Sequence, residues 1–362
     1  MASIRLLNKP EDFERLHISP EAPALWEDGR RNSNPAANNW EWWYSDFIFD
    51  DGSTAVVQFF TKAGRTIQMS GDHPCIHIRI KLAGGTELND NLMFKPSEVS
   101  FSTEQCDVRM KDNCFTGDLH TYHIRANSPK GYGVDLTLVS TVKPYRPGTA
   151  YIEMGAPENF YTWFCVVPTG TVSGTLSYNG QEHQVTGTGY HDHQWGSTNF
   201  LTEWNHWVWA RQRFEDYSLL ILDLVATAKY DYARFPIVFV QDKDGNVVFE
   251  NTSDVQCKVL SSYRDDVHSG KVYPQELEYT FKNNGKTLQY HLKETKVLEA
   301  GGLKSAPLPM KVLCKAMGIK HSYTRYLAQG DMVLTDTNGE IRRSSELIYE
   351  FMYPRDTFEG HM

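Results

Sequence analysis

Turn dipeptides set between short alternating stretches are the feature that most restricts how this chain can fold. Asp-Gly, Asn-Gly and Gly-Gly suit tight hairpin turns because these residues tolerate positive φ angles. Six such dipeptides stand beside the expected strands, at Asp51-Gly52, Gly84-Gly85, Asn179-Gly180, Asp244-Gly245, Asn284-Gly285 and Asn338-Gly339. Short strands joined by such turns predict an all-β fold, a sandwich or barrel of antiparallel meanders with few short helices.

Apolar residues that alternate with polar ones, and short apolar runs, mark the expected strands. Besides the stretch that follows Asn179-Gly180, they are residues 42–49, 55–60, 76–82, 115–124, 133–139, 162–167, 172–178, 206–213, 217–224, 235–241, 247–250, 278–282, 287–293, 331–334 and 347–352. The best helix candidate is 310–317. Residues 1–38 are expected to form an irregular arm, because Pro10, Pro20, Pro23 and Pro35 interrupt any helix.

The length of 362 residues suits two domains or one large β domain. The second half repeats the texture of the first. We therefore expect an arm over 1–38, an N-terminal β domain over 39–196 and a C-terminal β domain over 197–362. Aromatic residues make up 13% of the chain, enough for a core and for an aromatic ligand pocket, either inside a barrel or between two such domains.

The net charge of −9 argues against nucleic acid or an anionic membrane as the main partner. The sequence has no run of 18 apolar residues that would predict a membrane-spanning helix, and the first 20 residues lack an apolar signal core. We expect a cytoplasmic protein without stable membrane insertion. The six Cys residues form no CxxC pair, which favours free buried thiols.

Residues 187–211 concentrate groups that can move protons or face an apolar ligand. The stretch holds three of the thirteen His and four of the nine Trp. Because side chains alternate along a strand, Tyr190 and Asp192 would share one face, and His191 and His193 the other. An active site is expected here.

The pair His191 and His193 could bind a metal ion, with His183 or His206 as a third ligand. A cupin-type site would also offer a Glu a few residues later, but Gln194 to Ser197 supply none. We therefore predict no bound metal.

Asp192 is the candidate general acid. A carboxyl in an apolar, Trp-walled site has a raised pKa and can stay protonated near neutral pH. Trp43, Trp163 and Trp195 could stabilise a cationic intermediate through their ring faces. The alternative is that Asp192 only accepts hydrogen bonds from backbone amides in a Gly-flanked turn.

Glu41 precedes three aromatic residues at the start of the first strand and could be a rim charge or a buried acid. Nucleophilic catalysis has little support, since no Gly-x-Ser-x-Gly elbow and no activated Cys is evident. The absence of a P-loop or dinucleotide fingerprint argues against a nucleotide cofactor.

Two motifs carry a family resemblance: Glu41-Trp-Trp-Tyr44 and Gly189-Tyr-His-Asp-His-Gln-Trp-Gly196. With them the chain resembles the carotenoid 1,2-hydratase (hydroxyneurosporene synthase)/AttH-like superfamily, which includes fungal Diels–Alderases. The resemblance spans residues from about 38 to Glu350. It implies two lipocalin-like β domains and chemistry on hydrophobic polyenes, terpenoids or polyketides without a metal or cofactor.

The resemblance also implies roles for single residues. Tyr190 and Asp192 match the catalytic Tyr-x-Asp pair of the hydratases. Tyr161-Thr-Trp163 corresponds to their His-x-Trp pair, with Tyr161 in place of His, which speaks against carotenoid hydration. Glu41 matches a Glu of the cyclases, whose pocket lies between the domains. The predicted catalytic residues are Glu41, Tyr190, Asp192 and His193, and the predicted substrate-binding residues are Trp43, Tyr161, Trp163, Trp195, His206 and Trp207.

Three functions follow as hypotheses. The first is a cofactor-free cyclase of secondary metabolism that performs a (hetero-)Diels–Alder [4+2] step, with or without loss of water. The second is a hydratase or dehydratase that uses Asp192 as its acid. The third is a carrier that binds a hydrophobic ligand and performs no chemistry.

Overall fold

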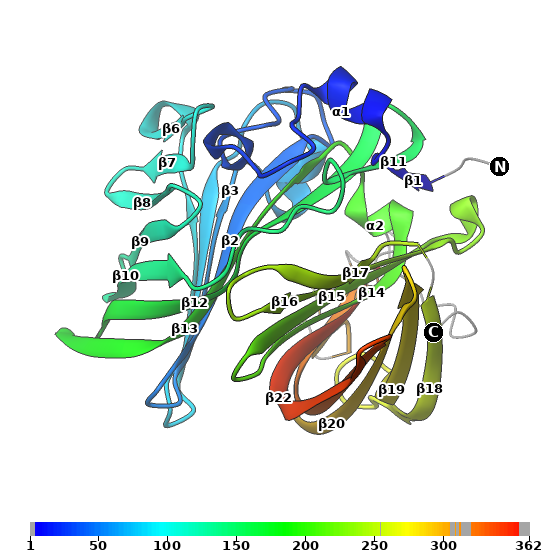
Figure 1. Cartoon of the computed structure of the whole chain (residues 1–362). Helices are drawn as coiled ribbons and strands as arrows, with labels where there is room; N and C mark the ends of the chain where they lie inside the picture. Colours follow the sequence, from blue (N-terminus) through cyan, green and yellow to red (C-terminus); the bar gives the residue numbers. More distant parts are fainter. Residues whose placement is uncertain (1–3, 254, 305–307, 309–310, 313–319, 355–362) are drawn as a thin grey trace. The chain divides into compact units, whose positions relative to one another are not determined.

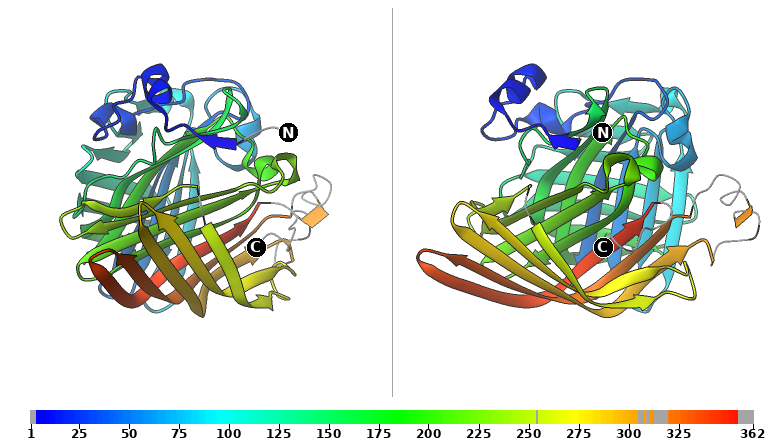
Figure 2. Two further views of the ribbon diagram at one scale, coloured as in Figure 1. Left: turned by 45° about the vertical axis from the view of Figure 1, so that its right-hand side comes forward. Right: turned by 90° about the vertical axis from the view of Figure 1, so that its right-hand side faces the viewer.

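A computed structural model describes residues 4–253, 255–304, 308, 311–312 and 320–354 (Figure 1). Almost all of their regular structure is antiparallel strand, in two curled sheets (Figure 2). The predicted all-β class with lipocalin-like domains is confirmed. The chain divides into two compact units, an N-terminal unit of residues 4–198 and a C-terminal unit that begins at residue 199.

The N-terminal unit is one sheet of thirteen strands. Its strands are β1 (Ile4–Leu6), β2 (Trp40–Phe49), β3 (Thr54–Phe60), β4 (Cys75–Lys81), β5 (Glu87–Met93), β6 (Val99–Phe101), β7 (Asp107–Met110), β8 (Asn113–Gly117), β9 (Thr121–Ser128), β10 (Tyr132–Ser140), β11 (Tyr151–Ala156), β12 (Asn159–Tyr178) and β13 (Gln181–Gly196). The order is β5-β4-β3-β2-β13-β12-β10-β9-β8-β7-β6, with β11 on β12 and β1 on β11. The long strand β13 therefore lies between β2 and β12.

The described residues of the C-terminal unit form a sheet of nine strands. They are β14 (Trp204–Arg213), β15 (Tyr217–Ala226), β16 (Arg234–Asp242), β17 (Val247–Asn251), β18 (Val255–Arg264), β19 (Val272–Asn283), β20 (Lys286–Gly302), β21 (Ser322–Asp336) and β22 (Gly339–Tyr353). The order β17-β16-β15-β14-β22-β21-β20-β19-β18 is that of two meanders joined by the pairing of β14 with β22.

All six predicted turn dipeptides connect adjacent antiparallel strands. They join β2 to β3, β4 to β5, β12 to β13, β16 to β17, β19 to β20 and β21 to β22. Gly52, Gly180 and Gly285 have φ angles of 84°, 72° and 75°, the left-handed conformation that made these dipeptides informative.

The prediction of an arm without helix was wrong. Residues Pro10–Leu16 form α1, in which Pro10 occupies the first turn, where a missing N–H costs nothing. Glu11 and Asp12 lie in that turn, where their negative charges interact favourably with the positive end of the helix dipole. A 3₁₀ turn follows at Leu25–Asp28 (η1), and further short helical turns lie at Gly64–Gln68, Pro96–Glu98, Phe200–Glu203 and Ala228–Tyr230.

In two places the predicted division into strands was wrong, and several other strands extend beyond their predicted bounds. The stretch 115–124 is two strands, β8 and β9, joined by a turn in which Leu119 has φ 71°. The stretches 162–167 and 172–178 belong to the single strand β12, whose register shifts between Cys165 and Gly170. The predicted helix over 310–317 falls outside the described residues, apart from Lys311 and Val312.

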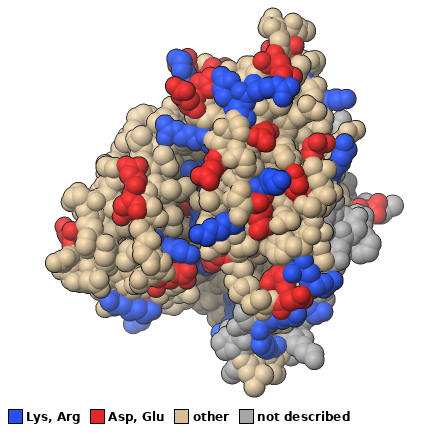
Figure 3. Space-filling view, turned by 90° about the horizontal axis from the view of Figure 1, so that it is seen from below, with Lys and Arg blue, Asp and Glu red and all other residues tan. Residues whose placement is uncertain are grey.

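Each sheet has one face covered by a hydrophobic core of its own. In the N-terminal unit that core is built by β2–β4, β7–β10, β12 and β13. The five described cysteines are free thiols, four of them buried. No helix in the described part of the chain is long and apolar enough to cross a membrane. On the face drawn in Figure 3, Lys and Arg are interspersed with Asp and Glu among the described residues.

Candidate active site

Strand β13 places consecutive side chains on opposite faces of its sheet, as alternation predicts. Its antiparallel register with β2 sets Asp192 opposite Tyr44 and His193 opposite Trp43. We call the side that contacts the hydrophobic core of the N-terminal unit the core face, because Trp43 and Trp195 belong to that core. The other side, which carries Tyr190 and Asp192, is the Asp192 face.

The Asp192 face holds a buried carboxyl surrounded by donors. Tyr190 donates its hydroxyl hydrogen to Oδ2 of Asp192 at 2.8 Å, and the indole N–H of Trp163 donates to the same oxygen at 3.2 Å. Asp192 is only 3% exposed and Trp163 and Tyr190 are fully buried. The carboxyl therefore accepts hydrogen bonds from side chains, and the alternative of a turn that satisfies backbone amides is wrong, since Asp192 lies within β13.

Gln194 completes this group, and sequence reasoning missed it. Its side-chain amide donates to Oδ1 of Asp192 at 3.0 Å, while its oxygen accepts a hydrogen bond from the Tyr161 hydroxyl at 2.8 Å. The signal was available in the strand period, because Gln194 follows Tyr190 and Asp192 at spacings of two.

Burial raises the pKa of Asp192 to about 6, even though hydrogen bonds from Gln194 and Tyr190 favour its charged form. The same burial, with the charge of Asp192, raises the pKa of the Tyr190 phenol. A carboxyl that titrates near neutrality can exist in both forms under ordinary conditions. The pair can thus donate a hydrogen bond or a proton to a ligand.

The core face holds a second buried group, centred on His193. Its Nε2 lies 2.8 Å from Oε1 of Glu41, and its Nδ1 lies 3.3 Å from Oδ1 of Asp28. Glu41 also accepts the backbone N–H groups of Arg31 and Asn32 at 2.6 and 2.9 Å. Glu41 is fully buried. It is therefore not a rim charge, and it fastens the segment after η1 to β2 and β13.

Attraction between the His193 ring and the carboxylates of Asp28 and Glu41 shifts the pKa values of this group. Burial alone would lower the pKa of His193, but the carboxylates of Asp28 and Glu41 outweigh it and raise that pKa. Burial would raise the pKa of Asp28, but the charge of His191 and hydrogen bonds to His191 and His193 hold it below its ordinary value. Trp43 stacks on the His193 ring, with centroids 4.6 Å apart.

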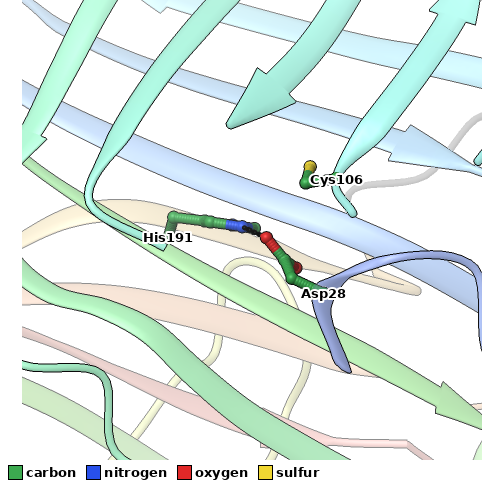
Figure 4. A group of neighbouring side chains, drawn as sticks. All are labelled: Asp28, Cys106 and His191. Atoms are coloured by element: carbon green, nitrogen blue, oxygen red, sulfur yellow. Dashed lines mark hydrogen bonds and ion pairs between the residues drawn. The ribbon is translucent and has the colours of Figure 1, made fainter. Parts of the chain in front are cut away.

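Asp28, Cys106 and His191 are the described residues that could hold a metal ion, with ligand atoms within 4.8 Å of one another (Figure 4). A carboxylate, a thiol and an imidazole would suit zinc. However, Asp28 Oδ2 already accepts the Tyr122 hydroxyl at 2.5 Å and contacts His191 Nε2 at 3.2 Å. Burial raises the pKa of the Cys106 thiol, which disfavours the thiolate ligand.

The predicted site residues therefore fall into three places. Tyr190, Asp192, Tyr161 and Trp163 come together on the Asp192 face, and Glu41, His193, Trp43 and Trp195 come together on the core face. His206 and Trp207 lie on β14 of the C-terminal unit, where His206 stacks on Phe351 with centroids 5.4 Å apart. Asp28 was not predicted, because η1 lay in the segment that we expected to be irregular.

Comparisons with known proteins agree with this fold. The family model described as AttH-like matches residues 77–296, more than half of the chain. No curated protein matches in sequence. An AttH-like structure from Nitrosomonas europaea is 15% identical with a TM-score of 0.60, over 94% of this chain and 99% of that one.

Two further solved structures share the fold at low identity. CghA, also solved with Sch210972, is 15% identical with a TM-score of 0.61 over 98% of both chains. Kievitone hydratase from Nectria haematococca is 13% identical with a TM-score of 0.55, over 93% of this chain and 94% of that one. Likeness at these identities shows a common fold.

Proposed function

The chain belongs to the AttH-like family, and on that premise we propose that it is a cofactor-free cyclase of secondary metabolism. The reaction is a (hetero-)Diels–Alder [4+2] cyclisation of a hydrophobic polyketide or terpenoid intermediate, with or without coupled loss of water. The fold is shared with a Diels–Alderase, CghA, and with a hydratase. A buried hydrogen-bond donor can lower the barrier of both kinds of reaction.

The observation that carries the proposal is the buried Tyr190–Asp192 pair with its raised carboxyl pKa. A donor aimed at a carbonyl of the substrate withdraws electron density and lowers the barrier to cycloaddition, a contribution of a few kcal/mol. The half-buried rings of Trp42 and Tyr44 lie on the same face and offer apolar surface on which a polyene can be folded. Holding the reacting ends together can supply at most about 7–11 kcal/mol.

The chemistry is assigned to the Asp192 face for a physical reason. On the core face Glu41 and His193 bond to each other, and Glu41 also accepts two backbone amides. Asp192 is also hydrogen-bonded, but its carboxyl, with a pKa of about 6, can hold an exchangeable proton near neutral pH. We therefore assign a structural role to Asp28, Glu41 and His193, which hold β13 in place.

A hydratase or dehydratase is the second candidate, favoured by the carboxyl pKa of about 6. Protonated Asp192, acting with Tyr190, would protonate an alkene or a leaving hydroxyl. The aromatic rings beside it would stabilise the cation that forms. A carrier without chemistry is the third candidate, and it needs no titrating group.

The first experiment is mass spectrometry of small molecules that co-purify with the protein, with metal analysis of the same sample. A bound polyketide or terpenoid without metal supports the proposal and supplies a lead for substrates. Stoichiometric zinc or iron overturns the metal-free mechanism and directs attention to Asp28, Cys106 and His191. With a substrate in hand, a cyclase gives a product of equal mass or one water lighter, a hydratase incorporates oxygen from labelled water, and a carrier returns the ligand unchanged.

A further inference from the structure

A chain of hydrogen bonds reaches Asp192 from the side opposite to Tyr190. The Tyr161 hydroxyl donates to Gln194 Oε1 at 2.8 Å, and the Gln194 amide nitrogen donates to Asp192 Oδ1 at 3.0 Å. The other carboxyl oxygen, Oδ2, is left to Tyr190 and Trp163. The two oxygens of one carboxyl therefore have different partners.

The amide of Gln194 has one sensible orientation in this arrangement. Burial raises the pKa of the Tyr161 phenol, so this hydroxyl keeps its hydrogen and can donate it. The amide oxygen of Gln194 satisfies that donor, which turns the NH₂ group toward Asp192. A flipped amide would set its oxygen against the carboxylate and leave the NH₂ group facing a phenol.

We propose that Gln194, oriented by Tyr161, is a positioning residue that assigns separate tasks to the two oxygens of Asp192. Oδ1 stays an acceptor of the Gln194 amide, and the exchangeable proton resides on Oδ2, beside the Tyr190 hydroxyl. Tyr190 is then the group that meets the substrate. This inference rests on the proposed function for its chemical meaning, but the proton position is a property of the free protein.

A proton can pass from Asp192 through Tyr190 to a substrate atom. In the protonated state, Asp192 Oδ2–H donates to the Tyr190 oxygen, and Tyr190 O–H donates to the substrate. When a substrate atom takes the proton, the Tyr190 O–H bond breaks and the Asp192 proton replaces it. Tyr190 ends neutral, Asp192 ends as a carboxylate, and the substrate gains one proton. For a cycloaddition, the same arrangement stops at the hydrogen bond.

The test is an infrared titration of protein labelled with ¹³C-aspartate, in which Asp192→Asn identifies the Asp192 carboxyl band. The wild-type band should titrate near pH 6. Gln194→Leu removes a donor to the charged form, so the midpoint should rise by roughly one unit or more. Gln184→Leu is the matched control, an exposed Gln on the same strand, and should leave the midpoint unchanged.

Tyr161→Phe removes the group that orients the amide and should raise the midpoint by less than Gln194→Leu does. If circular dichroism shows that Gln194→Leu is unfolded, the midpoint of Tyr161→Phe tests the proposal in its place. A midpoint that stays put or falls in the folded variants overturns the proposal. A shift without any turnover on candidate substrates supports the role of Gln194 and counts against the proposed function, whereas turnover without a shift does the reverse.

Discussion

Asp192 and His193 are adjacent in the chain, yet their side chains serve two separate buried networks on opposite faces of one sheet. The carboxyl of Asp192 meets Tyr190, Trp163 and Gln194, while the ring of His193 lies between Glu41 and Asp28. The strand period alone accounts for the separation. Mutations at the two neighbours should therefore have different kinds of effect.

Asp192→Asn should abolish most of any hydration or dehydration activity and leave the fold intact. The amide has similar volume but cannot supply a proton, and general acid catalysis contributes about 10²–10⁴-fold. A cycloaddition, which stops at the hydrogen bond, should lose less. The measurement is kcat/KM together with a thermal unfolding curve. Ligand affinity should change little. A variant that keeps activity within twofold of the wild type would leave a carrier, or an acid elsewhere, as the better explanation.

The pH dependence of kcat/KM should follow the protonated form of Asp192. Its carboxyl has a pKa of about 6, so activity should be level at lower pH and fall about tenfold per unit above that value. A pH–rate profile on the wild type and on Gln184→Leu checks this expectation. A limb that rises with pH through the same region would instead make Asp192 a base.

Glu41→Gln should destabilise the protein more than it impairs chemistry. The substitution leaves His193 with one carboxylate in place of two and weakens the contacts to the backbone of Arg31 and Asn32. Removing one partner of a buried ion pair costs about 3 to 5 kcal/mol. Urea unfolding gives the free energy, with Glu182→Gln on the exposed part of β13 as the control. Unchanged stability with lost activity would return Glu41 to the catalytic group.

Stability should be greatest at mildly acidic pH. His193 has a raised pKa, so its contribution is complete below the ordinary value of 6.5 and is lost as pH rises through the higher folded value. Asp28 has a lowered pKa, so its contribution is present above 3.8 and is lost as pH falls toward the folded value. Tm measured against pH should decline at both ends.

His193→Gln is the variant that tests this assignment. It should flatten the decline of Tm at the alkaline end and keep the decline at the acid end. An alkaline decline that persists unchanged in this variant would assign it to another group.

Local chemistry explains what the sequence could predict. Asn-Gly and Asp-Gly specify their turns within two residues, and the period of two placed Tyr190 with Asp192 and His191 with His193. Asp28 escaped prediction because it meets His191 across 163 positions of sequence, which no local pattern reports. The helix at Pro10 was missed for a different reason, since a proline that interrupts a helix also begins one well.

The alternation along β13 also has a consequence for adaptation. Side chains at positions 190, 192 and 194 and their neighbours on β12 contact one network, while those at 191, 193 and 195 contact the other. Laboratory evolution toward new substrates can therefore randomise every second residue of the strand and leave the intervening ones fixed. Selection on chemistry and selection on folding would then act on interleaved but separate sets of codons.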